Sequence, residues 1–201
     1  MGKGCKIPGI FKFIFVSLSG FFCSILAYLT MYHYLELNDN PIICDAVILF
    51  VGPSYQTRLS EAYELLNEGY SNTLIIPAYR RLAVIENGEK VSEMKSSDFR
   101  RARTDYPKYY ERTHIEVLEA KKIMDELGFA SAIMVSAPGH MRRIKIISSK
   151  VFDLEKYDIR YIGSRYSKRE SLFSILNWSH IQFVLLEYVK IFSFFVYGYA
   201  I

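Results

Sequence analysis

The sequence of 201 residues predicts an α/β protein in which one doubly wound, mostly parallel sheet is preceded by a single N-terminal transmembrane helix. Three observations predict this class. An uncharged run near the N-terminus has the length of a membrane span. After it, short continuous apolar runs alternate with helical patterns. Hydrophobic residues make up 51% of the chain and charged residues 23%, which excludes a disordered chain.

The N-terminal run carries no charge between Lys12 and His33. A helix of about twenty residues, at about 1.5 Å each, matches the roughly 30 Å hydrocarbon core of a bilayer. Lysines precede the run and acidic residues follow it, so the positive-inside rule predicts a cytoplasmic N-terminus. A cleaved signal peptide is the alternative, but its apolar core is shorter and needs a small-x-small site that is missing here. We therefore predict a basic tail and anchor over 1–37 and an extracytoplasmic domain over 38–201, held in the plasma (inner) membrane by one pass.

The net charge of +4 comes from the basic N-terminus. All acidic residues lie at Glu36 or later, and three lysines (Lys3, Lys6 and Lys12) precede that position. The remainder is almost neutral, so the charge balance gives no reason to expect a nucleic-acid partner. The three cysteines and four histidines show no zinc-type or paired spacing, so the sequence supports no metal site.

The first elements follow one another in βαβ order. The run DAVILFVG at 45–52 is apolar almost throughout, which is typical of a strand buried on both faces. Residues 56–69 carry a helical stripe and end at a glycine, and the next strand is TLIIPA at 73–78. Further on, Asn87-Gly88 between two alternating arms predicts a hairpin. The polar residues 95–108 predict a loop.

The second half continues the alternation and ends in an apolar tail. Its expected elements are a helix over 111–127, a strand over 131–137, a basic helix from residue 140, a strand over 157–163 and helices over 171–176 and 178–198. Glu187 and Lys190 interrupt the apolar tail 181–201, which leaves too few uncharged residues to span a membrane. We predict that the tail docks on the domain as a core helix; a helix lying on the membrane surface is the alternative.

Ligands of open α/β sheets bind at the carboxyl ends of the strands. That rule selects three segments, Gly52–Gln56, Pro77–Arg80 and Ala137–His140. The first segment leads into a helix that Ser54, Gln56, Thr57 and Arg58 open. Its free N–H groups suit an anion, whereas spacing alone favours an ordinary N-cap at Ser54 or Thr57. Neither nucleotide-binding glycine motif is present, so the cofactor remains unknown.

The segment VSAPGHMRR places His140 at the start of a helix after a buried strand. A histidine there has a lowered pKa and can act as a base, and Arg143 can grip a carboxylate or phosphate with two parallel hydrogen bonds. A plain helix start with surface arginines is the alternative. At the head of the helix 111–127, Thr113 and Glu116 have the spacing of a capping box; Glu116 as a general base or ligand contact is the sharper interpretation.

Four blocks, in order over residues 45–190, resemble the YdcF/SanA/ElyC-like envelope proteins. They read DAVILFVG, RLSEAYELLNEG, ERTHIEVLEA and VSAPGHMRR, and a tail-helix glutamate follows in LLEYVKIF. The resemblance implies a Rossmann-like domain with a polar pocket at the strand ends, lined by Gly52, Arg58, Thr113, Glu116, His140 and Arg143. Many members of that family carry N-terminal membrane helices and are linked to envelope integrity or cell-wall synthesis. The chain departs from the family pattern at Pro77-Ala78-Tyr79, where SGG is usual, and at Val117, where Asn is usual.

Two functions are compatible with these residues. The first is an envelope enzyme acting on an anionic, phosphate-containing small molecule or lipid-linked carrier, in which Arg58 and Arg143 bind the anion, His140 moves a proton and Glu116 orients His140 or a water. The second is a non-catalytic binding or regulatory module that uses the same pocket. An enzyme needs His140 and Glu116 to converge within hydrogen-bond reach, which separates the two.

Overall fold

The computed structural model describes residues 9–86, 89–95, 105–167 and 172–198. The chain divides into two compact units, Met1–Tyr34 and Leu35–Ile201. The first unit consists of helix α1, which extends over Gly9–Leu35. The second unit contains every strand of the sheet and the remaining described helices.

Helix α1 confirms the predicted N-terminal apolar helix. Its stretch Phe13–Leu35 is long and apolar enough to cross a membrane, although a signal sequence would meet the same criterion. Its large side chains, such as Phe15 and Phe21, are exposed. A helix that is hydrophobic all round is typical of a membrane span or of a helix buried in a protein core. Anchoring and the side on which the domain lies remain predictions.

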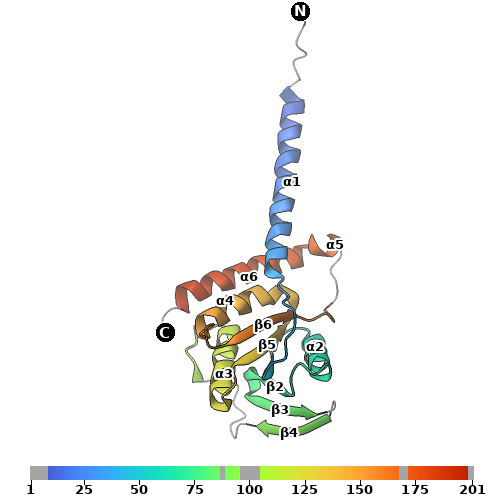
Figure 1. Cartoon of the computed structure of the whole chain (residues 1–201). Helices are drawn as coiled ribbons and strands as arrows, with labels where there is room; N and C mark the ends of the chain where they lie inside the picture. Colours follow the sequence, from blue (N-terminus) through green and yellow to red (C-terminus); the bar gives the residue numbers. More distant parts are fainter. Residues whose placement is uncertain (1–8, 87–88, 96–104, 168–171, 199–201) are drawn as a thin grey trace, which may run out of the picture. The chain divides into compact units, whose positions relative to one another are not determined.

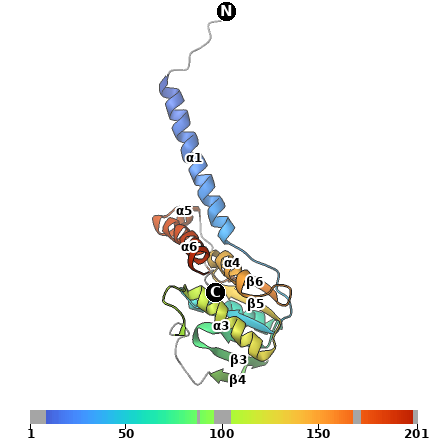
Figure 2. The same cartoon turned by 90° about the vertical axis from the view of Figure 1, so that its left-hand side faces the viewer.

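The sheet of the second unit has six strands in the order β4-β3-β2-β1-β5-β6 (Figures 1 and 2). The inner strand β1 pairs in parallel with β2 and β5, and β5 pairs in parallel with β6. The α/β class with a mostly parallel sheet is therefore confirmed. The parallel strands are β1 (Ala46–Leu49), β2 (Thr73–Ile76), β5 (Ser131–Ser136) and β6 (Asp158–Gly163).

The predicted hairpin forms the antiparallel end of this sheet. Its arms are β3 (Arg81–Glu86) and β4 (Glu89–Lys95), and β3 also pairs antiparallel with β2. The Asn-Gly turn itself, at 87–88, lies outside the described residues, as does most of the predicted loop 95–108.

Helices cover both faces of the sheet, as the side chains of β1 show. Its residues are all buried and alternate between two cores. Val47 and Leu49 face helix α2 (Tyr55–Asn67), while Ala46 and Ile48 face helices α3 and α4. Each fully buried aliphatic side chain contributes about 1.5–3 kcal/mol to the free energy of unfolding. Because β1 is buried on both faces, its sequence is apolar at every position. In Figure 1, α2 lies on one side of the sheet and α3 on the other.

The second face is covered by α3 (Arg112–Leu127) and α4 (Met141–Val151), and α6 (Trp178–Tyr197) packs against α4. Helix α4 contacts α3 on one side and α6 on the other. Two shorter helical segments accompany them, a 3₁₀ turn at Pro138–His140 and α5 at Leu172–Ile175. The tail helix therefore docks through one face, with Val184 and Phe194 buried.

The prediction that the tail is too short to span a membrane is wrong. As a 20-residue helix, α6 is long and apolar enough by length and composition. The two charges that interrupt it, Glu187 and Lys190, pair with each other and are therefore accommodated within the protein.

The strand order places the loops after β1 and β5 side by side. Strand β1 lies between β2 and β5. From β1 the chain passes through α2 to β2 on one side, whereas it enters β5 and then β6 on the other side. Connections that diverge from neighbouring parallel strands leave room for a ligand at the carboxyl ends. This is the edge at which the predicted site residues gather.

Candidate functional site

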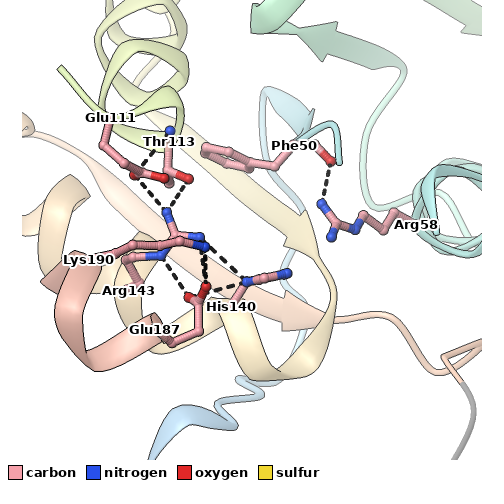
Figure 3. Close-up of polar contacts among 8 residues, drawn as sticks. All are labelled: Phe50, Arg58, Glu111, Thr113, His140, Arg143, Glu187 and Lys190. Carbon is pink, nitrogen blue, oxygen red and sulfur yellow. Dashed lines mark hydrogen bonds and ion pairs between the residues drawn. The ribbon is translucent and has the colours of Figure 1, made fainter. Parts of the chain in front are cut away.

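Four segments converge at the carboxyl ends of β1 and β5: the start of α2, the start of α3, the start of α4 and the middle of α6. Figure 3 shows the polar contacts among their side chains. The predicted residues Arg58, Thr113, Glu116, His140 and Arg143 all lie here and are mostly buried. Their individual surroundings differ, and the differences decide what each can do.

Arg58 is a buried cation in the first turn of α2. Its side chain is 2% exposed, its Nη1 donates a hydrogen bond to the carbonyl oxygen of Phe50 at 3.3 Å, and its Nε has no partner. No carboxylate pairs with it among the described residues. Burial lowers the pKa of its guanidinium, but arginine stays charged in proteins. The site therefore holds one positive charge whose compensation is incomplete.

Gly52 lies against this guanidinium, which explains the glycine. A Cβ atom at position 52 would stand only 2.8 Å from Nη1 of Arg58. Any other residue would therefore displace the arginine from the strand end. Ser54 is different: it is exposed, occupies the N-cap position of α2 with φ 59°, and makes no side-chain capping bond. The structure does not bring the Ser54 side chain into contact with the other predicted residues.

Glu116 is a buried acid without a hydrogen-bond partner among the described residues. Its side chain is 6% exposed. Burial raises its pKa to about 8, although the positive charge of Arg58 opposes this. At neutral pH Glu116 is therefore mostly protonated and can donate a hydrogen bond. A neutral acid near an uncompensated arginine leaves the site positive.

The guanidinium of Arg143 already donates its hydrogen bonds to protein groups, so its predicted role as an anion-binding residue changes. Its Nε donates to Glu187 Oε2 and its Nη1 to Glu111 Oε2, both at 2.7 Å. Nη1 also donates to the hydroxyl of Thr113. With these donors engaged, Arg143 has little left for an external anion. The guanidinium instead ties α3, α4 and α6 together, where each charge-assisted hydrogen bond is stronger than a neutral one.

The capping box predicted for α3 is wrong. Glu111, not Thr113, occupies the N-cap position, and its side chain accepts from the backbone N–H of Thr113. The Thr113 hydroxyl is then available to Arg143, while Glu116 turns into the site and forms no reciprocal capping bond.

His140 is paired with Glu187, a residue that was not among the predicted site residues. Its Nδ1 lies 3.2 Å from Oε2 of Glu187, which is completely buried and also accepts from Lys190 at 2.9 Å. Burial alone would raise the pKa of Glu187, but the hydrogen bond from His140 and the charge of Arg143 outweigh it and lower the pKa. Glu187 is thus an anion, and we assign the proton to Nδ1 of His140.

The imidazole is held ready to accept a proton. Burial lowers the pKa of His140, although Glu187 partly offsets this. A neutral ring that donates from Nδ1 leaves a free electron pair on Nε2. In Figure 3 that second nitrogen points away from Glu187, toward the side of the site where Arg58 lies. The predicted contact between Glu116 and His140 is not formed; Glu187 orients the histidine in its place.

A weak signal in the sequence indicated Glu187. A single acid in an otherwise apolar helix must find a buried partner or lie in water. The sequence does not reveal that its partner is Arg143, 44 residues earlier in the chain. Among the described residues, no group of three or more histidine, cysteine, aspartate or glutamate side chains could hold a metal ion.

Comparison of the chain with protein-family models, with curated proteins and with solved structures gives no match. The resemblance to the YdcF/SanA/ElyC-like proteins therefore remains a prediction. Chemically, the site combines an undercompensated cation, a neutral acid that can donate and a neutral base with its lone pair free. That combination suits an anion with a nearby proton to transfer.

Proposed function

We propose that this chain is a membrane-anchored cell-envelope protein that binds an anionic, phosphate-containing ligand at the carboxyl ends of β1 and β5. The observation that carries the proposal is Arg58, a buried guanidinium without a carboxylate partner among the described residues. A buried charge without compensation costs several kcal/mol, and an anion that offsets it gains correspondingly.

Each site residue has a distinct part in this proposal. Arg58 supplies the positive charge, and protonated Glu116 donates a hydrogen bond to an anion oxygen. Arg143 acts as a positioning residue, because its own donors hold Glu187 and Glu111. Gly52 keeps the approach to Arg58 open. No role in binding is assigned to Ser54, which lies exposed.

In the enzymatic form of the proposal, His140 is a general base. Its Nε2 accepts the proton of a water or hydroxyl whose oxygen attacks the phosphorus of a bound phosphate ester or diphosphate. The P–O bond to the leaving group breaks, and the imidazolium, stabilised by Glu187, returns the proton to the leaving oxygen. General base catalysis by a positioned histidine typically accelerates a reaction by about 10²–10⁴-fold.

A non-catalytic binding or regulatory module is the second candidate, and one observation favours it. Catalysis as predicted from the sequence requires Glu116 and His140 to converge, and no hydrogen bond joins these two residues. A module would still bind the anion through Arg58, while His140 and Glu187 would serve the packing of α6. Substitution of His140 distinguishes the two candidates. In an enzyme it would reduce turnover and leave anion binding unchanged, whereas a binding module has no turnover to lose.

The finer assignments belong to the proposal as well. A doubly wound, Rossmann-like fold is supported by the helices on both faces of the sheet and by the divergence after β1. Membership of the YdcF/SanA/ElyC-like family is supported by the four sequence blocks. A single pass of the plasma (inner) membrane, with the N-terminus in the cytoplasm, is supported by α1 and the lysines before it.

A thermal-shift screen of the full chain in detergent tests the proposal. The ligands are nucleotides, sugar phosphates and lipid diphosphates. A ligand at 100 times its Kd adds about 2.7 kcal/mol of stability to the wild type. We expect Arg58→Gln to abolish that shift. Arg142→Gln should retain it, because Arg142 is turned about 100° from Arg143 around helix α4. A shift that is equally large in Arg58→Gln would contradict the proposal.

A further inference from the structure

Helix α6 has two faces of opposite character. Its inner face is buried on α4, through Val184, Glu187, Ile191 and Phe194. Its outer face is apolar and exposed, which is unusual for a surface helix, because such helices normally turn polar residues outward.

The exposed residues form a continuous stripe. At 100° per residue, five of them fall within an arc of about 60° on the side opposite the buried face. The stripe runs for about 27 Å, from a tryptophan near the first turn to a valine in the last. Its members are Trp178, Leu185, Val189, Phe192 and Val196, all of them exposed. A contiguous apolar surface of this kind marks an interaction site.

The chain itself indicates the partner. The apolar stretch of α1 ends at Leu35, and the backbone is already fastened to the folded unit at Asn38, whose Oδ1 accepts from the N–H of Gly163. Three residues reach at most about 11 Å. A bilayer that holds α1 therefore lies next to the folded unit, and some surface of that unit must face the lipid.

We infer that the exposed stripe of α6 rests in the interfacial layer of the membrane that holds α1. Tryptophan and tyrosine favour that layer, and Trp178 and Tyr197 stand at the two ends of the helix. The ion pairs of Glu187 keep the opposite face on the protein, so α6 lies along the surface and does not cross it. This inference rests on the anchoring that is part of the proposed function.

The same helix then links the bilayer to the site. Glu187 holds His140 from the inner face of α6, and the stripe is on the other face, about one helix diameter or 10–12 Å away. The headgroup region of the bilayer is therefore within reach of the site. Among the ligands of the screen, this geometry favours the lipid diphosphates over the soluble sugar phosphates.

Trp178 is the only tryptophan in the chain and is 67% exposed, which makes it a native probe. The full chain is reconstituted in phosphatidylcholine–phosphatidylglycerol vesicles that contain spin-labelled lipids. We expect blue-shifted emission and stronger quenching by labels near the headgroup than by labels at the bilayer centre. Emission typical of water and no quenching by either label would overturn the inference. Quenching strongest at the centre would overturn it as well, because Trp178 would then lie outside the interfacial layer.

A matched pair of variants isolates the stripe. Val189→Glu combined with Phe192→Glu places two charges on it, and we expect lipid quenching of Trp178 to fall at least two-fold. Leu154→Glu combined with Leu127→Glu places two charges at exposed positions away from α6 and should leave quenching unchanged. Because all four side chains are exposed, both variants should melt as the wild type does. Equal quenching in the two variants would contradict the inference.

Flotation of the same vesicles separates this inference from the proposed function. If the chain floats but Trp178 stays in water, the stripe has another partner, such as a second copy of the chain, and only the inference fails. If the chain does not float at all, the proposed anchoring fails and the inference fails with it. Anion binding through Arg58 is scored independently by the thermal shift.

Discussion

At the scale of single residues, Glu116 makes the stability of this protein depend on pH in an unusual direction. Burial raises its pKa to about 8 in the folded protein, against a value near 4.5 when it is solvated. Between those pH values the folded protein binds more protons than the unfolded chain. The free energy of unfolding therefore falls as pH rises through this window.

Glu116→Gln should remove this dependence. We expect the variant to be more stable than the wild type at pH 9, by on the order of 2 kcal/mol, and equally stable near pH 4. Denaturant titrations at the two pH values provide the measurement. Glu126→Gln, at an exposed position of the same helix, should follow the wild type. A wild type whose stability is flat between pH 5 and 8 would contradict the burial of a protonated carboxyl group here.

The second residue-scale prediction concerns His140. Its pKa is lowered by burial and partly restored by the Glu187 carboxylate. Glu187→Gln removes that negative charge, so the pKa of His140 should fall further, as measured by NMR titration of the imidazole. Glu111→Gln is the matched control, because Glu111 contacts Arg143 and not the histidine. If the two variants shift the pKa of His140 equally, Glu187 does not orient the ring.

At the scale of elements, α6 belongs to the folded unit and is not an appendage. It buries Val184, Ile191 and Phe194, each worth about 1.5–3 kcal/mol, and supplies the carboxylate of the ion pair with Arg143. Removing one partner of a buried pair costs about 3–5 kcal/mol more. The sum reaches the whole stability of an ordinary domain, about 5–15 kcal/mol.

Ending the chain after Asn177 should therefore unfold the second unit. Circular dichroism of the truncated chain in detergent should show no cooperative melting of the sheet, whereas α1 retains its helical signal. A truncated chain that melts at the wild-type temperature would place α6 outside the cooperative unit.

The elements were predictable because their signals are local. Continuous apolarity marked β1 and β5, and Asn87-Gly88 marked the β3–β4 hairpin. Partners distant in the sequence were not predictable. The pattern at Thr113 and Glu116 reads as a capping box only while Arg143, 30 residues away, is ignored. Likewise the strand-end rule located His140 and the helix start that carries Arg58. It contains no information that His140 pairs with Glu187 or that Arg58 pairs with no carboxylate among the described residues.

At the scale of the whole molecule, the proposed anchoring by α1 predicts on which side of the membrane the site lies. Three lysines and no acidic residue precede the apolar stretch Phe13–Leu35, so the N-terminus should stay in the cytoplasm. An alkaline phosphatase fusion after residue 40 should be active and a β-galactosidase fusion at the same point inactive. Changing all three lysines to glutamate should reduce the phosphatase activity. The reverse pattern of reporter activity would place the domain in the cytoplasm.

The central claim is that Arg58 binds an anion at the strand ends, and a crystal structure with a bound phosphate ligand tests it most directly. The ligand is the compound that gives the largest thermal shift. We predict a phosphate oxygen about 2.7–2.9 Å from the Arg58 guanidinium, within hydrogen-bond reach of Glu116, while Arg143 keeps Glu187 and Glu111. A phosphate bound elsewhere, with Arg58 still bonded only to the Phe50 carbonyl, would contradict the account.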